Sequence, residues 1–386
     1  MPTIIYLVHG MGCGTATGEP RAPDAAWSIG AVEAMRWIAQ TFGLPEPAVL
    51  DPLPVDPPPG SDDPAALWLV PISYHAVFDE FRSASQDRRQ LARSLGDGVL
   101  TDGEVTRLMQ SDFAWVNCVD VLLWWADTIQ SRNWATVKIL DAITAADALA
   151  TRAAPGGSVR RILISHSLGT AATTYALGEL AKQAAWRNRG AFDAWFTLAN
   201  VAPFVLEARR VYDQALVPGA PRSLIPGFMF NARNDLDPIP WLLPWRAFSA
   251  TDAGPLAHAW QSAEDDGLYS LVETRGVSAP PGLVPAISDV HGFANYLVSP
   301  RIATLLAGQA RGEAFSDEEL AEIGNVPWDE LPALRCRNPG AVASLRSAVE
   351  IYSRRGPGSV SNNKDRALVD RLLEGVELLA AARDQC

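Results

Sequence analysis

Short apolar runs alternate along this chain with longer segments in which apolar residues recur every three or four positions. A short apolar run between turn residues predicts a buried strand, and the longer recurrence predicts an amphipathic helix. The predicted strands cover residues 4–8, 67–73, 159–164, 194–200, 227–231 and 268–273, and the predicted helices include residues 25–42, 168–182 and 255–262. This alternation predicts an α/β fold with a mostly parallel sheet and helices on both of its faces.

Three further segments lie outside this alternation. Residues 44–64 are acidic and rich in proline, which fixes φ and lacks a backbone N–H, so we expect an extended loop or a mobile flap there. The pattern over residues 78–151 predicts a long helical tract with breaks. The pattern over residues 307–386 predicts further helices, and this segment has no chemical motif. We therefore expect a core over residues 1–306, with 44–64 and 78–151 as insertions, and a helical C-terminal extension over 307–386.

Composition narrows the class of protein. The 386 residues are 48% hydrophobic and 20% charged, which is typical of a globular protein, and the net charge of −12 argues against nucleic acid as a partner. No segment approaches the roughly 18 uninterrupted apolar residues of a membrane span. The first residues lack the basic region and the apolar length of a signal peptide, and the four cysteines form no CxxC pair. These features predict a cytoplasmic protein.

The most informative stretch for chemistry is residues 159–172, where a predicted strand turns sharply into a predicted helix. The turn reads Ser165-His166-Ser167-Leu168-Gly169. A serine at such a turn presents its hydroxyl at the carboxyl end of the strand, and small residues two positions away let strand and helix approach closely. Serine and glycine also pair in ordinary turns, but the flanking strand and helix favour Ser167 as a nucleophile.

A serine hydroxyl needs a base to remove its proton, and the base needs a carboxylate to fix its tautomer. The predicted strand over 268–273 is followed by His291, and the strand before it is followed by Asp235 and Asp237. The chain has five histidines. We expect His291 to be the base, because the other four precede Ser167, adjoin it, or lie in a predicted helix.

The choice between the two aspartates depends on the local backbone. Pro238 biases Asp237 toward an extended conformation, which fixes the direction of its carboxylate. Asp235 follows Arg233 and Asn234 and is more typical of a turn residue that bonds local N–H groups. We expect Asp237 to be the acid and keep Asp235 as the alternative.

Together these motifs resemble the α/β-hydrolase superfamily of serine hydrolases, in particular its lipase- and esterase-like members. The resemblance covers roughly residues 2–306 and rests on the turn at 165–169, the pair His9-Gly10, the segment 232–240 and the segment 288–296. The turn resembles the nucleophile elbow G-x-S-x-G, with Ser165 in place of the first glycine. His9 is expected to be structural rather than a base.

The resemblance implies a role for each of five residues. Ser167 would be the nucleophile, His291 the base and Asp237 the acid of a catalytic triad. The backbone N–H groups of Met11 and Leu168 would form the oxyanion hole. No metal or cofactor is expected.

The substrate implied by the resemblance is a small-molecule or lipid ester. Trp241 and Trp245, just after the predicted acid, would suit an apolar acyl group, although they could equally pack a surface loop. Two alternatives remain open. The same triad could serve an acyltransferase or thioesterase, or the fold could be a non-catalytic scaffold that binds a partner, which has no physical need of a triad.

Overall fold

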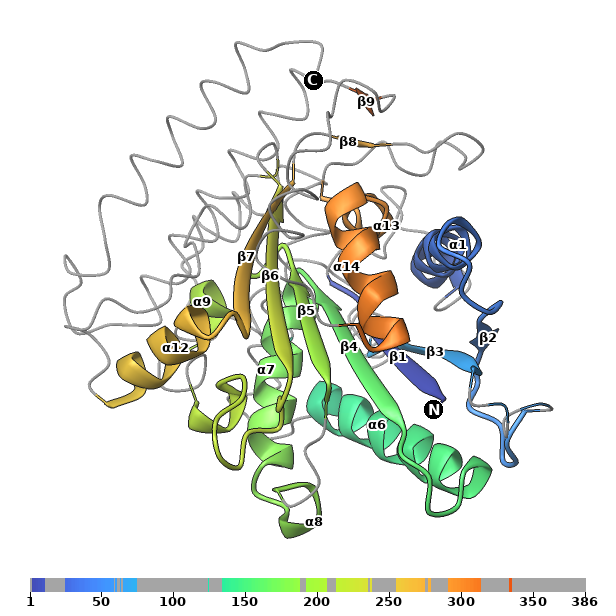
Figure 1. Ribbon diagram of the computed structural model, residues 1–386, viewed down its shortest axis with the longest axis horizontal. Coiled ribbons are helices and arrows are strands. Elements are labelled where there is room, and N and C mark those ends of the chain that lie inside the picture. The colour runs from blue at the N-terminus through green and yellow to red at the C-terminus, as the bar shows by residue number, and fades with distance from the viewer. Residues whose placement is uncertain are drawn as a thin grey trace, which may run out of the picture.

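The computed structural model describes residues 2–10, 25–58, 60, 63, 65–74, 124, 134–187, 192–206, 213–234, 237, 255–274, 277–278, 291–313 and 333–334. Within these ranges the chain is an α/β structure built on one seven-stranded sheet, with the strand order β2-β3-β1-β4-β5-β6-β7 (Figure 1). Every pair of neighbouring strands in this sheet is parallel, as the sequence predicted. The strands are β1 (Thr3–Val8), β2 (Ala48–Val49), β3 (Leu67–Ile72), β4 (Arg160–His166), β5 (Ala194–Leu198), β6 (Phe228–Asn234) and β7 (Tyr269–Thr274).

The central strands are buried on both faces because helices cover the sheet from both sides. Every residue of β1 is buried, which explains why its sequence is an apolar run rather than an alternating pattern. Successive side chains of a strand point to opposite faces, so Ile5 and Leu7 join one apolar cluster, whereas Ile4 and Tyr6 join another.

The first cluster packs the sheet against α1 (Ala25–Thr41), α13 (Phe293–Leu297) and α14 (Pro300–Arg311). The second packs the opposite face against elements that include α6 (Trp134–Ala153), α7 (Leu168–Leu180), α8 (Ala184–Arg187), α9 (Ala202–Val205), η1 (Gln214–Leu216) and α12 (Pro255–Asp265). Figure 1 shows α13 and α14 lying along the sheet near α1. A separate antiparallel pair joins β8 (Val277–Ser278) to β9 (Ala333–Leu334).

The structure corrects the expectation for the proline-rich stretch and adds detail elsewhere. Residues 44–64 are not wholly irregular, because they contain β2, which pairs with β3 through the short register Ala48 to Trp68 and Val49 to Leu69.

In the tract at 78–151 the described part is Trp124 and α6, and the rest lies outside the described residues. The core helix α14 continues to Arg311, across the boundary predicted at residue 306. The helices predicted near the C-terminus also lie outside the described ranges.

The topology brings the ends of β1 and β4 together at the middle of the sheet. From β1 the chain continues to β2 and β3 on one side, and then returns to β4 on the other side of β1. Ligands of open α/β sheets bind at such a switch point, outside the carboxyl ends of the strands. None of the helices in the described part of the chain combines the length and apolar character that a membrane span requires.

Candidate active site

Ser167 lies at the switch point in a strained conformation. It is the single residue between the end of β4 and the start of α7, and its backbone has φ 51° and ψ −128°. A positive φ is unfavourable for a residue with a Cβ, so neighbouring groups must hold it. The Ser167 N–H donates to the carbonyl of Leu198 (2.9 Å), and the Ser167 carbonyl accepts from the N–H (2.9 Å) and hydroxyl (2.6 Å) of Thr170.

Two glycines allow the turn to press against the end of β1. A Cβ atom on Gly169 would lie 2.2 Å from the carbonyl oxygen of His9, and one on Gly10 would lie 2.3 Å from Cβ of Ser167. Both distances are far below van der Waals contact, so neither position has room for a side chain. The glycines of the predicted elbow and of the predicted His-Gly turn are therefore required by the same close approach.

Ser165 occupies the place where the resemblance would put a first glycine, and the structure gives it a role. Its buried hydroxyl accepts a hydrogen bond from the indole N–H of Trp195 on the neighbouring strand β5 (2.9 Å). A glycine would leave that indole without this acceptor. Serine is therefore tolerated in place of the first glycine, because its side chain is small and its hydroxyl accepts from the buried Trp195 indole.

Three of the predicted site residues form a continuous hydrogen-bonded line. His291 Nε2 lies 2.8 Å from Ser167 Oγ, and His291 Nδ1 lies 2.7 Å from Asp237 Oδ2. A carboxylate only accepts, so the hydrogen bond assigns the proton to Nδ1 and leaves Nε2 to accept from the serine hydroxyl. Ser167 and Asp237 are fully buried, whereas 18% of the His291 side chain is exposed. The ring therefore links a buried acid to a buried hydroxyl and remains partly exposed.

Asp237 also bonds to a second group, Tyr296, which the sequence did not indicate. The hydroxyl of Tyr296, on α13, donates to Oδ2 of Asp237 (2.7 Å) and accepts the backbone N–H of Asn234 (3.1 Å). The N–H of Asp237 donates to the carbonyl of Asn234 (3.2 Å), which closes a tight turn after β6. Tyr296 lies in the segment 288–296 that was singled out for His291, but nothing in that pattern indicated its contact with Asp237. The alternative acid, Asp235, lies outside the described residues.

The expected oxyanion hole is described in part. Leu168 is the first residue of α7, so its N–H belongs to the first turn, where intrahelical acceptors are lacking and the helix dipole is positive. This N–H is thus available to a developing negative charge. Met11, the other expected donor, lies outside the described ranges.

The end of β1, just before Met11, is held by contacts of His9. The buried His9 ring donates from Nδ1 to the carbonyl of Gly10 (2.6 Å) and stacks on Tyr74 with ring centroids 4.7 Å apart. The Tyr74 hydroxyl donates to the carbonyl of His9 (3.0 Å). With its ring engaged in the turn, His9 is placed to hold the end of β1 rather than to act as a base.

His166, the residue between Ser165 and Ser167, contacts the backbone of the histidine in the triad. Its Nε2 lies 2.7 Å from the carbonyl oxygen of His291, and its ring stacks on Phe293 with centroids 5.1 Å apart. His166 is buried. The sequence placed it beside the nucleophile but did not suggest this contact, because the contact joins segments 125 residues apart.

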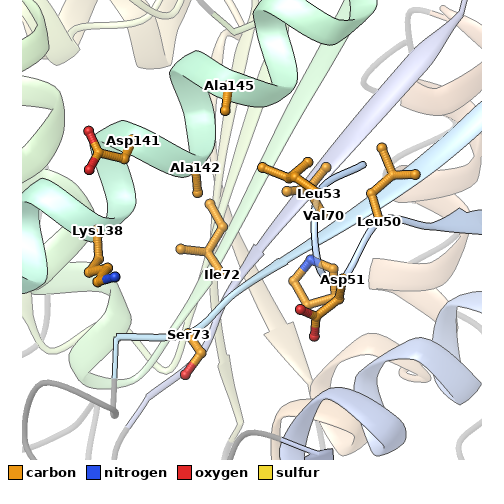
Figure 2. A pocket seen from close by; sticks show the side chains of 11 residues that line it. Leu50, Asp51, Leu53, Val70, Ile72, Ser73, Lys138, Asp141, Ala142 and Ala145 are labelled. Atoms are coloured by element: carbon orange, nitrogen blue, oxygen red, sulfur yellow. The ribbon is translucent and has the colours of Figure 1, made fainter. Parts of the chain in front are cut away.

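A cavity of about 350 Å³ lies between α6, β3 and the segment after β2. Figure 2 shows Lys138, Asp141 and Ala142 of α6 along one wall, facing side chains of β3 and of the segment after β2. None of the three triad residues lines it. The acyl pocket was predicted from Trp241 and Trp245, and both tryptophans lie outside the residues that the structure describes.

Comparison of the chain with models of protein families, with curated proteins and with solved structures finds no match. The functional assignment therefore depends on the residues themselves. The strained turn at Ser167, the hydrogen bonds of His291 and the burial of Asp237 support it.

Proposed function

We propose that this protein is a serine hydrolase of the α/β-hydrolase superfamily, lipase- or esterase-like, that cleaves a carboxylic ester through an acyl-enzyme. The observation that carries the proposal is that His291 bonds to Ser167 Oγ at 2.8 Å and to Asp237 at 2.7 Å. Nucleophile, base and orienting acid are thus in hydrogen-bond reach of one another at the carboxyl ends of the strands.

In the first half of the proposed reaction, Ser167 Oγ attacks the carbonyl carbon of the ester while His291 Nε2 takes the hydroxyl proton. The carbonyl oxygen becomes an oxyanion, which the N–H groups of Leu168 and Met11 stabilise. The intermediate then collapses, the bond from carbon to the alkoxy oxygen breaks, and His291 gives its proton to the departing alcohol. The acyl group remains on Ser167.

In the second half, a water molecule attacks the acyl carbon and His291 removes one of its protons. Collapse of this intermediate releases the carboxylic acid and returns the proton to Ser167 Oγ. Asp237 stays ionised throughout, and its charge stabilises the imidazolium form of His291 in both halves. No metal or cofactor takes part in the proposed cycle.

The strained serine supports a catalytic role over a purely structural one. Residues held at unfavourable φ and ψ cost roughly 1–3 kcal/mol and cluster at active sites. A binding scaffold would gain nothing from a buried carboxylate aligned through a histidine to a serine at φ 51°. The geometry therefore favours catalysis over the scaffold alternative.

The proposed substrate is a small-molecule or lipid ester, with Trp241 and Trp245 as the proposed acyl pocket. The net charge of −12 disfavours nucleic acid, and a cytoplasmic location agrees with the separated cysteines. An acyltransferase or thioesterase would use the same residues and would differ only in the acceptor or in the leaving group.

Labelling with a fluorophosphonate, followed by mapping of the modified peptide, tests the proposal directly. We expect one label per chain on Ser167 and none in Ser167→Ala, because only an activated serine reacts. Folded wild-type protein that remains unlabelled would transfer the assignment to a scaffold. Product analysis of an ester with competing alcohol present then separates hydrolysis from acyl transfer, since a transferase forms the new ester in preference to the free acid.

A further inference from the structure

His166 and Ser167 are consecutive, and their side chains contact different atoms of His291: His166 contacts its backbone carbonyl and Ser167 its ring. The His166 side chain packs among aromatic residues of α13, with its ring parallel to that of Phe293 (8° between planes) and 5.8 Å from that of Tyr296. A Cβ atom on Gly10 would lie 3.0 Å from Nδ1 of His166, so the ring is also enclosed on that side. His166 thus has a fixed position between the strand β4 and α13.

The contact between His166 and His291 has a defined donor. A carbonyl oxygen only accepts, so the proton of this hydrogen bond belongs to Nε2 of His166. Burial, followed by the nearby charge of His291, lowers the pKa of His166 well below its ordinary value. The ring therefore stays neutral near neutral pH, and its single proton is the one on Nε2.

This hydrogen bond connects the turn that carries Ser167 to the backbone of His291. Ser167 and His291 are 124 residues apart in the chain, and the reaction requires their Oγ and Nε2 atoms to keep a distance of 2.8 Å. His166 is covalently joined to Ser167 and holds the carbonyl of His291. A shift of the turn at Ser167 would therefore also move the main chain of His291, to which the ring is attached.

We infer that His166 is a positioning residue of the triad, which holds the main chain of His291 so that its ring bridges Asp237 and Ser167. The inference rests on the proposed function, because His166 contributes to turnover only if the triad is catalytic. It assigns to His166 a hydrogen-bonding role, and not merely the filling of space between β4 and α13.

Two variants of nearly equal length separate the hydrogen bond from the packing. His166→Gln loses the ring but places an amide N–H near the original Nε2, whereas His166→Met loses the ring and has no donor. The same pair of substitutions at His258, an exposed residue of α12, supplies the control. Melting temperatures of all four variants show which proteins are folded before any activity is compared.

For hydrolysis of a p-nitrophenyl ester we expect His166→Met to lower kcat by about 10²-fold, because small misplacements of catalytic groups have effects of that size. KM should change by less than about threefold, since His166 does not contact the substrate. His166→Gln should recover most of the loss, and the His258 variants should match the wild type. Equal kcat values for Gln and Met at position 166, with both proteins folded, would overturn the inference.

A second readout does not require activity. The proton on His291 Nδ1, bonded to Asp237, should give a downfield resonance in the proton NMR spectrum that is absent in Asp237→Asn. We expect His166→Met to lose or broaden this resonance and His166→Gln to keep it. If the wild type neither hydrolyses esters nor labels, the proposed function fails, and this resonance alone then decides the positioning role. An unchanged resonance in His166→Met would refute it.

Discussion

The hydroxyl of Tyr296 donates a hydrogen bond to Oδ2 of Asp237, the same carboxylate oxygen that bonds to His291. Two donors from opposite ends of the segment 291–296 thus converge on one buried oxygen. The two hydrogen bonds hold this oxygen in place. It also ties α13, which begins just after His291, to the turn that carries the acid.

The first prediction concerns Tyr296→Phe, which removes the buried hydroxyl that donates to Asp237 and accepts from the N–H of Asn234. We expect a loss of about 1–3 kcal/mol in the free energy of unfolding, as is usual for a buried group left unsatisfied, together with a lower kcat. Urea denaturation and ester hydrolysis measure the two effects.

Tyr6→Phe is the matched control for this substitution. The Tyr6 hydroxyl is buried and has no hydrogen-bond partner among the residues that the structure describes. Removing it should leave the stability unchanged or slightly higher, because no hydrogen bond is lost. Similar losses for both tyrosine variants would contradict a specific contribution of the bond to Asp237.

The second prediction uses the strain at Ser167. Glycine normally lowers stability by roughly 0.5–1 kcal/mol relative to alanine, but it adopts positive φ without steric cost. At φ 51° we therefore expect this order to reverse, so that Ser167→Gly is at least as stable as Ser167→Ala. Both variants should be inactive. A clearly more stable alanine variant in thermal melts would argue that no strain is stored at this turn.

The third prediction compares two glycines of the same helix, α7. Gly169→Ala would force a Cβ to 2.2 Å from the carbonyl oxygen of His9, whereas a Cβ on Gly178 meets nothing within 4 Å. We expect Gly169→Ala to destabilise the fold and to reduce activity by moving the elbow. Gly178→Ala should raise the free energy of unfolding by up to about 1 kcal/mol through helix propensity. Equal effects on denaturation midpoints would refute the close approach of α7 to β1.

The fourth prediction concerns acid stability. Burial, and then the charge of His291, lower the pKa of His166 in the folded protein well below the unfolded value of about 6.5. Between these two pKa values the unfolded chain binds a proton that the folded protein does not bind. This contribution to stability is therefore complete above about pH 6.5 and is lost as the pH falls, by at most about 1.4 kcal/mol per pH unit.

His166→Gln should weaken this dependence, because glutamine does not titrate. Denaturation of the wild type and of His166→Gln between pH 7 and pH 5 measures it. A wild type and a His166→Gln variant with parallel slopes over this range would show that His166 is not kept neutral by the fold.

Much of the sheet and of the site was predictable because the signals are local. The apolar run of β1 and the turn around Ser167 carry their structure in a few consecutive residues. Their spacing and the order of the strands then placed Asp237 and His291. The short strand β2 was missed because it exists through its pairing with β3 rather than through its own sequence. The contacts of His166 and Tyr296 were missed for a similar reason, since each joins distant segments.

The last prediction separates Asp237 from Asp235. Asp237 Oδ2 accepts from His291 Nδ1, and this bond keeps Nε2 free of a proton and able to receive one from Ser167. In Asp237→Asn the amide can donate to Nδ1 instead, which favours the opposite tautomer, with the proton on Nε2. We expect kcat to fall by up to ~10⁴-fold with the fold intact, as for the loss of a triad carboxylate. Asp235→Asn, the matched substitution two residues earlier, should cost less than about tenfold. Both are measured on one ester, with thermal melts as the control for folding, and the reverse ranking would transfer the role of the acid to Asp235.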